Sequence, residues 1–268
     1  MPELSATTAS GRVIHVDPAD ERGRRLVAAN GDLNPGSRRL WQRALAAHAW
    51  DLVVDVGANY GEMLVGVDLP PAARVVAFEP QPVVRGLLER TLVDNDLDVE
   101  VRPEVLAREA GTASFAVDLA WSGQSAIAAP GDGDHPERYG LATVPATTLD
   151  QLLGDELDGA GSFCVKVDVE GFEADVLAGG AAALARTDRW VLMIEVLHLP
   201  ASYVADLALR HTVLLLDERT GGLVQVPGGN AELVRRLRDG RWLYGQDCLV
   251  AGATGAAWLL DAATSRLG

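Results

Sequence analysis

The sequence is poor in lysine, in cysteine and in long apolar runs. Lys166 is the sole lysine among 268 residues, and the 23 basic residues are outnumbered by 38 acidic ones, which gives a net charge of −15. The arginines are dispersed or lie in short groups, such as Arg22, Arg24 and Arg25, that we interpret as solvated helix faces. Because phosphate binding requires clustered cations, this composition argues against a nucleic-acid partner.

The sequence also lacks a disulfide pattern, a secretory signal and a membrane-spanning segment. The two cysteines, Cys164 and Cys248, lie in apolar runs without CxxC spacing, which is typical of buried reduced thiols in a cytoplasmic protein. No apolar run approaches the ~20 residues that cross a bilayer, and no early segment has the pattern of a secretory signal, so we expect no membrane partner. The 48% hydrophobic content is enough for a large core.

Short apolar runs alternate with helical patterns along most of the chain. The predicted strands are residues 51–57, 73–80, 99–106, 162–171 and 190–197, and the predicted helices are residues 60–67, 81–95, 172–186 and 200–210. Alternation of this kind indicates a doubly wound α/β fold with a mostly parallel sheet.

Both ends of the chain depart from that rhythm. Residues 1–50 are predicted to be a helical N-terminal segment that covers the site, and residues 51–268 form the main domain. Within that domain, residues 111–148 resemble an insertion with a long loop. The two apolar runs around a Thr-Gly-Gly turn in residues 211–226, together with residues 246–251, predict antiparallel strands at one edge of the sheet.

A glycine-containing loop follows the strand at residues 51–57. Its spacing, Gly57-x-x-x-Gly61, lacks the middle glycine that lets a backbone approach a pyrophosphate. Asp55 repels a pyrophosphate but suits an ammonium group, and Glu79 at the end of the next strand can accept hydrogen bonds from both hydroxyls of a ribose. The implied ligand is an adenosine with a cationic amino-acid tail, S-adenosylmethionine.

Four segments occur in a recognisable order: VVDVGANYG, VVAFEP, KVDVEGFEADVLAGG and MIEV. Together they resemble the FkbM family of S-adenosylmethionine-dependent methyltransferases, over about residues 51–197. The resemblance implies the Rossmann-like class I methyltransferase fold, α/β with a doubly wound, mostly parallel seven-stranded sheet. It also implies methyl transfer, commonly to a hydroxyl oxygen.

The resemblance also assigns cofactor contacts to particular positions. It implies that the methionine part is surrounded by Asp55, Gly57, Ala58, Asn59, Tyr60 and Gly61, the ribose by Glu79 and Pro80, and the adenine by Glu104, Val105 and Leu106. Here the chain has PEVLAR where relatives often have an Ala-Leu pair, so the adenine contacts differ from the family pattern.

Charges alternate with valines in the stretch FCVKVDVEGFE. In an extended strand Lys166, Asp168 and Glu170 share one face, and in a parallel sheet such charges lie near the carboxyl end, where ligands bind. Asp168 could hold the cofactor's ammonium or orient the acceptor, with Lys166 neutralising the acids. The next strand supplies Glu195 and His198, again at a carboxyl end.

Methyl transfer to an alcohol requires removal of the hydroxyl proton. His198 is the best single candidate for the base, because histidine gains and loses a proton near neutral pH, and Glu195 or Asp168 could orient it or accept the proton. Alternatively, Asp168, Glu170, Glu195 and His198 could bind one divalent ion, magnesium or manganese, or His198 could be purely structural.

The sequence therefore predicts an O-methyltransferase for a small hydroxylated molecule, a sugar or a natural-product intermediate. Trp121, with Ser122, Gln124 and Ser125, could line the acceptor pocket. Two alternatives stay open: a non-catalytic subunit that binds S-adenosylmethionine, and a nucleotide-dependent oxidoreductase, which the missing glycine disfavours. A homo-oligomer is compatible with the sequence. We expect acceptor specificity to depend on the N-terminal segment and the insertion, which are the least patterned parts of the chain.

Overall fold

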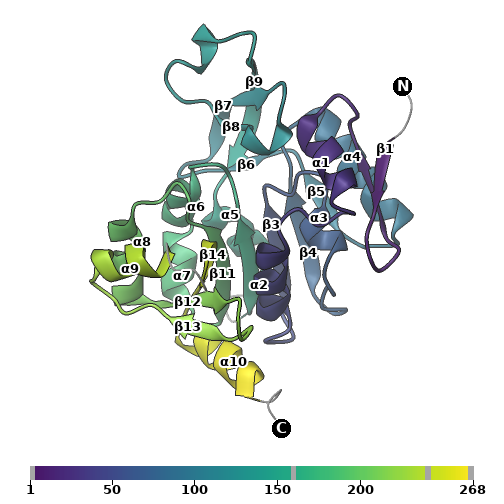
Figure 1. Cartoon of the computed structure of the whole chain (residues 1–268). Coiled ribbons are helices and arrows are strands. Elements are labelled where there is room, and N and C mark those ends of the chain that lie inside the picture. The colour runs from purple at the N-terminus through teal and green to yellow at the C-terminus, as the bar shows by residue number, and fades with distance from the viewer. Residues whose placement is uncertain (1–3, 158–160, 239–242, 265–268) are drawn as a thin grey trace.

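The centre of the molecule is a twisted eight-stranded sheet in the order β13-β12-β14-β11-β10-β3-β4-β5 (Figure 1). The computed structural model describes residues 4–157, 161–238 and 243–264. The strands of this sheet are β3 (Leu52–Val56), β4 (Arg74–Phe78), β5 (Glu100–Arg102), β10 (Phe163–Val167), β11 (Trp190–Glu195), β12 (Thr212–Asp217), β13 (Leu223–Gln225) and β14 (Leu243–Ala251).

The strand order confirms the fold that the sequence predicted. Strands β5, β4, β3, β10 and β11 run parallel, and β14 inserts antiparallel between β11 and β12. This is the seven-stranded arrangement of class I methyltransferases, and β13 adds an eighth strand at the β12 edge. The hairpin of β12 and β13 and the reversed β14 form the predicted antiparallel edge.

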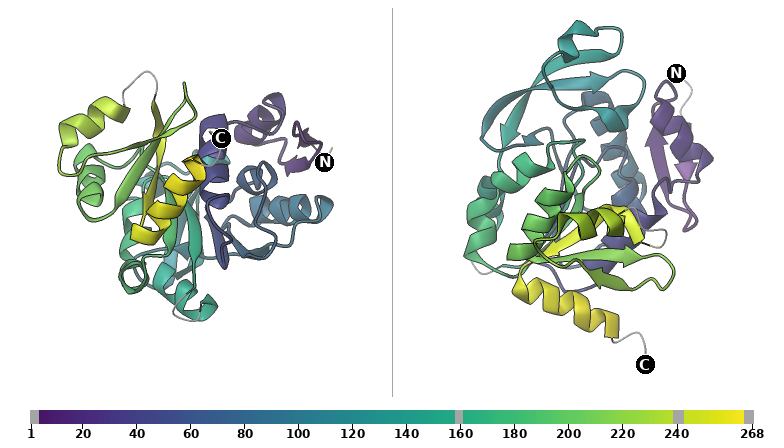
Figure 2. Two further views of the ribbon diagram at one scale, coloured as in Figure 1. Left: turned by 90° about the horizontal axis from the view of Figure 1, so that it is seen from below. Right: turned by 60° about the vertical axis from the view of Figure 1, so that its left-hand side comes forward.

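Helices cover both faces of the sheet, as the buried strands require. Leu52, Val54 and Val56 of β3 pack on one face with α5 (Leu149–Glu156), α6 (Glu173–Ala178), α7 (Ala181–Arg186), α8 (Ala201–Arg210) and α9 (Ala231–Arg238). Val53 packs on the other face with α2 (Pro35–Leu45), α3 (Glu62–Val65), α4 (Pro82–Asp94) and α10 (Ala253–Thr264). The views of Figure 2 show the layers from below and from the side. Because side chains alternate along a strand, one strand supplies both cores.

A second, smaller sheet rises above the carboxyl ends of the central strands (Figure 1). Its order is β6-β9-β7-β8, with β6 (Val105–Leu106), β7 (Gly111–Asp118), β8 (Ala126–Ile127) and β9 (Tyr139–Thr147). The 3₁₀ turns η1 (Ser122–Gln124) and η2 (Asp132–Asp134) connect these strands. Residues 111–148, interpreted above as an insertion, thus supply three strands of a separate sheet.

The N-terminal segment is not helical throughout, which corrects the sequence-based description of residues 1–50. The segment contains two helices, α1 (Glu21–Ala28) and α2, but β1 (Leu4–Thr7) and β2 (Val13–Val16) form an antiparallel hairpin before them. Thr91 of α4 accepts a hydrogen bond from the backbone N–H of His15, and Asn95 bonds both backbone groups of Val13. These partners lie about eighty residues away in the sequence, so the local pattern carries little sign of the hairpin.

The charged strand is shorter than its alternating pattern predicts. Strand β10 ends at Val167, and Asp168 and Glu170 follow it in a turn, with Glu170 at φ +55° and Gly171 at φ +105°. Side chains therefore cease to alternate between the two faces after Val167. Lys166 stays inside the sheet, whereas the acids after it are free to point elsewhere.

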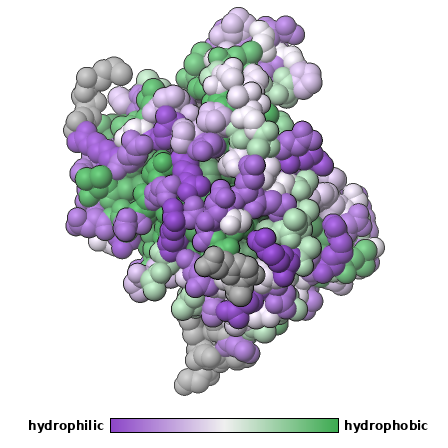
Figure 3. Space-filling view, turned by 180° about the vertical axis from the view of Figure 1, so that it is seen from behind, coloured by the Kyte–Doolittle hydropathy of each residue, from purple (hydrophilic) through white to green (hydrophobic). Residues whose placement is uncertain are grey.

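Hydrophilic side chains cover much of the surface seen from behind, with hydrophobic ones exposed in smaller patches (Figure 3). Among the residues that the structure describes, no helix combines the length and the hydrophobicity that a membrane span requires.

Candidate active site

A cavity of about 560 Å³ lies at the carboxyl ends of β3, β4, β10 and β11, beneath the small sheet. Carboxyl ends at this point of an open α/β sheet are the usual place for a ligand. Of the residues predicted from the sequence, the cavity wall contains Gly57, Asn59, Glu79, Pro80, Glu104, Val105, Leu106, Asp168, Glu170, Glu195 and His198.

The glycine loop passes very close to the end of β10. Gly57 has φ +80°, and a Cβ atom built on it would lie 2.0 Å from the carbonyl oxygen of Asp168. The backbone N–H groups of Gly57 and Ala58 both donate to the carbonyl of Phe78. Gly57 is therefore required by the neighbouring chain, which leaves no room for a side chain, and not only by a ligand.

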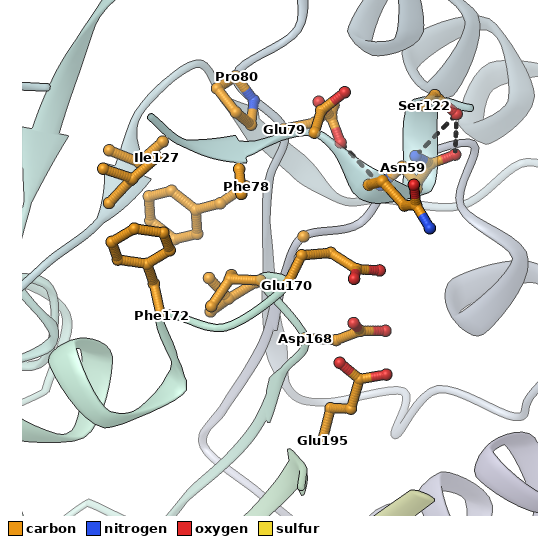
Figure 4. A pocket seen from close by; sticks show the side chains of 18 of the residues that line it. Asn59, Phe78, Glu79, Pro80, Ser122, Ile127, Asp168, Glu170, Phe172 and Glu195 are labelled. Atoms are coloured by element: carbon orange, nitrogen blue, oxygen red, sulfur yellow. Dashed lines mark hydrogen bonds between the residues drawn. The ribbon is translucent and has the colours of Figure 1, made fainter. Parts of the chain in front are cut away.

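Glu79 is held in place by backbone groups on both sides (Figure 4). Its Oε2 accepts a hydrogen bond from the N–H of Asn59 and its Oε1 accepts one from the N–H of Gln81, each 2.9 Å long. Burial raises the pKa of Glu79 to about 7, although both of these hydrogen bonds act in the opposite direction. Each carboxylate oxygen keeps a second lone pair, so the group can still accept two hydroxyl donors.

A buried polar network joins α1, the glycine loop and η1. Asp20 accepts hydrogen bonds from the hydroxyls of Tyr60 and Ser122, each 2.7 Å long. Arg22 donates to Asn59 Oδ1 at 2.9 Å and lies 3.1 Å from Glu62 Oε2, with its side chain only 13% exposed. The interpretation of Arg22 as a solvated surface residue is therefore wrong, because its partners come from distant segments that fold over it.

Apolar side chains line the part of the cavity beyond Glu79. Val105 and Leu106, which the resemblance assigned to an adenine pocket, meet Phe78, Phe115 and Ile127 there. Phe172 lies beside Phe78 in Figure 4. The sequence did not single out Phe115 or Ile127, because only the folding of the insertion into a sheet brings them here.

Trp121 and the polar residues after it also line the cavity. The guanidinium of Arg25 lies 4.8 Å from the centre of the Trp121 ring, and Ser122, Gln124 and Ser125 lie beside it. The structure thus brings this predicted group to the same cavity as Glu79.

Lys166 lies behind the wall of the cavity and not on it. Its Nζ is 3.1 Å from Asp55 Oδ1 and 3.4 Å from Asp168 Oδ2, and it also donates to the carbonyl of Gly57. Burial alone would lower the pKa of Lys166, but the carboxylates of Asp55 and Asp168 raise it. Lys166 and Asp55 are partners in register on β10 and β3, so the pair is part of the sheet.

Asp168, Glu170 and Glu195 lie together on the side of the cavity away from Phe78 (Figure 4), and His198 lines the same cavity. His198 Nε2 lies 3.3 Å from Glu170 Oε2 and 4.0 Å from Glu195 Oε2. Burial and the neighbouring Asp168 raise the pKa of Glu170 to about 7. Burial and the charges of Asp168 and Glu170 raise that of Glu195 to about 9. We call Asp168, Glu170, Glu195 and His198 the acidic cluster.

Some residues that the sequence assigned to the site lie away from the cavity wall, namely Asp55, Ala58, Tyr60, Gly61 and Lys166. The carboxylate of Asp55 is fully buried against Lys166, and the Tyr60 hydroxyl faces Asp20. Gly61, at φ +86°, begins α3, and a Cβ there would lie 2.7 Å from Leu88. These residues shape the loop from behind.

Comparison with known proteins gives one family and several distant structures. A family model described as "Methyltransferase FkbM domain" matches residues 55–220. The AMB antimetabolite synthetase AmbE of Pseudomonas aeruginosa PAO1 is 31% identical over a region that covers 54% of this chain and 8% of that protein. This chain thus spans a small fraction of that relative's length.

Two solved structures illustrate the structural matches. An O-methyltransferase from Bacillus cereus in complex with SAH has 12% identity and a TM-score of 0.40, with 85% of this chain and 87% of that chain covered. A methyltransferase from Geobacter sulfurreducens has 15% identity and a TM-score of 0.43, with 88% and 90% covered. The fold assignment rests instead on the strand order and on the family match.

Proposed function

Since this chain belongs to the FkbM methyltransferase family, we propose that it transfers a methyl group from S-adenosylmethionine to a hydroxyl oxygen of a small molecule. The observation that carries the proposal is the shared cavity, in which Glu79 at the end of β4 and the acidic cluster at the ends of β10 and β11 face the same space (Figure 4). The acceptor would be a sugar or a natural-product intermediate, and no nucleic acid or membrane takes part.

The residues of the cavity fit the cofactor. Glu79 offers two fixed carboxylate oxygens to the ribose hydroxyls. Phe78, Val105 and Leu106 would give the adenine ring apolar walls, and Asp168, which lines the same cavity, would pair with the ammonium group. Bound there, S-adenosylmethionine would supply an electrophilic methyl group.

The acidic cluster supplies what a hydroxyl acceptor needs from the protein. A hydroxyl oxygen must lose its proton during methyl transfer, so a proton acceptor within hydrogen-bonding reach is required. Asp168, Glu195 and His198 all line the cavity, and His198 Nε2 lies within 4.0 Å of carboxylate oxygens from both Glu170 and Glu195. These carboxylates would orient the hydroxyl, and His198 is our first candidate for the proton acceptor.

The relative AmbE supports a role in natural-product synthesis through its name, an antimetabolite synthetase. Because this chain covers 8% of AmbE, the activity of that whole protein does not extend to it. We propose only that the acceptor belongs to the same broad kind of chemistry.

Methyl transfer can be tested with purified protein, S-adenosylmethionine and a panel of hydroxylated sugars and natural-product intermediates. We expect S-adenosylhomocysteine release that depends on the acceptor, and a product heavier by one methyl group, placed on oxygen by NMR. Calorimetric titration with S-adenosylmethionine and with NAD gives the control. Cofactor binding without transfer to any acceptor would favour a non-catalytic subunit, and binding of NAD alone would favour an oxidoreductase.

A further inference from the structure

Glu170, Glu195 and His198 come from two neighbouring strand ends and converge on one point. Glu170 follows β10, Glu195 ends β11, and His198 lies three residues beyond it. One ligand-type atom from each of the three lies within 4.8 Å of the others. The three residues thus offer two carboxylate oxygens and one imidazole nitrogen to a common centre.

The distances from His198 Nε2 to the two carboxylates suit a six-coordinate cation. With metal–ligand distances of about 2.1 Å, adjacent ligands of an octahedral site lie about 3.0 Å apart and opposite ligands about 4.2 Å apart. His198 Nε2 lies 3.3 Å from Glu170 Oε2 and 4.0 Å from Glu195 Oε2, inside or close to that range. Oxygen ligands with one imidazole are the set that magnesium and manganese prefer.

Glu195 gives an independent sign that a ligand is expected here. Its side chain is almost completely buried, with 4% of the residue exposed, and its Oε2 accepts no hydrogen bond from any residue in the described ranges. In Figure 4 its carboxylate points toward Asp168 and into the cavity. A buried carboxylate oxygen without a donor is costly, so a partner from outside the chain is expected.

The nearby lysine does not neutralise the acids around this point. Lys166 Nζ contacts Asp55 and Asp168, at 3.1 and 3.4 Å, so its single charge is shared between two carboxylates. No salt bridge between Lys166 and either Glu170 or Glu195 occurs among the described residues, which leaves two further carboxylates beside His198. A cation at the common centre would balance them.

We propose that Glu170, Glu195 and His198 bind one divalent cation of the magnesium or manganese type. This inference rests on the proposed function only for its role: three protein ligands leave open positions for the acceptor's hydroxyl oxygen and for a second oxygen of the acceptor or a water. An acceptor with two neighbouring oxygens, such as a vicinal diol, would bind best. The cation would make the hydroxyl more acidic and hold it still, and with His198 bound to the cation the released proton would pass to Asp168 or to water.

Binding can be measured without cofactor or acceptor. The full chain is freed of metal with EDTA, dialysed, and titrated with Mn²⁺ while the EPR signal of free Mn²⁺ is followed. We expect one Mn²⁺ per chain, competed by Mg²⁺, and affinity at least about tenfold lower in Glu195→Gln and in His198→Ala. The matched controls are Glu137→Gln and His135→Ala, which alter an exposed His–Glu pair with a 3.4 Å separation. Both should bind as the wild type does.

Equal Mn²⁺ binding by all four variants would overturn the proposal, because it would mean unspecific attraction to an acidic protein. Absence of binding by the wild type would overturn it as well. Circular dichroism checks that each variant is folded, and Glu170→Gln replaces any variant that is not. The two proposals can fail separately. Methyl transfer that persists in EDTA would support the proposed function and contradict a role for the cation. Tight Mn²⁺ binding without any methyl transfer would support the cation site and contradict the proposed function.

Discussion

The two ends of the cavity differ in how completely the chain satisfies its own polar groups. At one end, both oxygens of Glu79 accept backbone hydrogen bonds, and the glycine loop beside it is tied to Phe78. At the other, one oxygen of Glu195 has no hydrogen-bond donor among the residues that the structure describes, and His198 is half exposed beside two carboxylates. Under the proposed function, the cofactor contacts of Glu79 would be preformed, whereas Glu195 and His198 would gain a partner only when the cation or the acceptor binds.

The buried pair between the two ends should give the largest effect. Lys166→Met leaves the carboxylate of Asp55 buried without its partner, and we expect a loss of about 3–5 kcal/mol in the free energy of unfolding. Urea denaturation measures it. The double variant Asp55→Leu/Lys166→Met should recover part of that loss, because no lone charge is left in the sheet. A loss below about 1 kcal/mol would mean that the pair does not hold the two strand ends.

Replacing the histidine tests the unsatisfied end. His198→Ala should lower turnover by about 10² while affinity for S-adenosylmethionine and the melting temperature change little, since the side chain is half exposed and makes no hydrogen bond to Glu79 among the described residues. Steady-state kinetics and calorimetry together measure this split. His135→Ala serves as the control for loss of an exposed imidazole. Full activity in His198→Ala would show that the proton leaves by another route.

Replacing Glu79 tests the satisfied end. Glu79→Ala should weaken S-adenosylmethionine binding by about 1–3 kcal/mol, because the ribose hydroxyls lose a charged acceptor that two backbone groups hold in position. Calorimetry gives the affinity. Turnover at saturating cofactor should fall less than in His198→Ala. Unchanged affinity would remove Glu79 from the cofactor site.

The smallest effect concerns pH. Burial raises the pKa of Glu79 to about 7, so the carboxyl is largely neutral at pH 6 and ionised at pH 8. An ionised carboxylate is the better acceptor for hydroxyl donors, by about 1 kcal/mol. Affinity for S-adenosylmethionine should therefore rise roughly fivefold between pH 6 and pH 8, and Glu79→Gln should flatten the curve. A wild-type affinity that is constant over this range would contradict the expectation.

Much of the fold could be predicted because its signals are local. Buried parallel strands read as short apolar runs, and the helices between them have their own periodicity, so β3, β4, β10 and β11 fall where the pattern indicated. The hairpin of β1 and β2 was missed because Thr91 of α4 and Asn95, which caps that helix, stabilise it from far away in the sequence. The strand containing Lys166 was extended too far because the alternation of charge continues into a turn.

The candidate site divides in the same way. Glu79 and the glycine loop directly follow predicted strands, so the sequence places them at the carboxyl ends of those strands. Arg22, Phe115 and Ile127 reach the cavity from the N-terminal segment and the insertion. The hydrophobic periodicity of these segments does not indicate how they pack against the central sheet.

The sequence alone thus determined the doubly wound sheet, its antiparallel edge, the glycine loop and the set of acids at the strand ends, because each depends on the period of one strand or helix. Only the tertiary structure decided that Lys166 pairs with Asp55 inside the sheet, while Glu170, Glu195 and His198 meet in the cavity. The reason is physical: the side on which a charge lies depends on where its strand ends and on which neighbour pairs with it, and both are properties of the packed sheet.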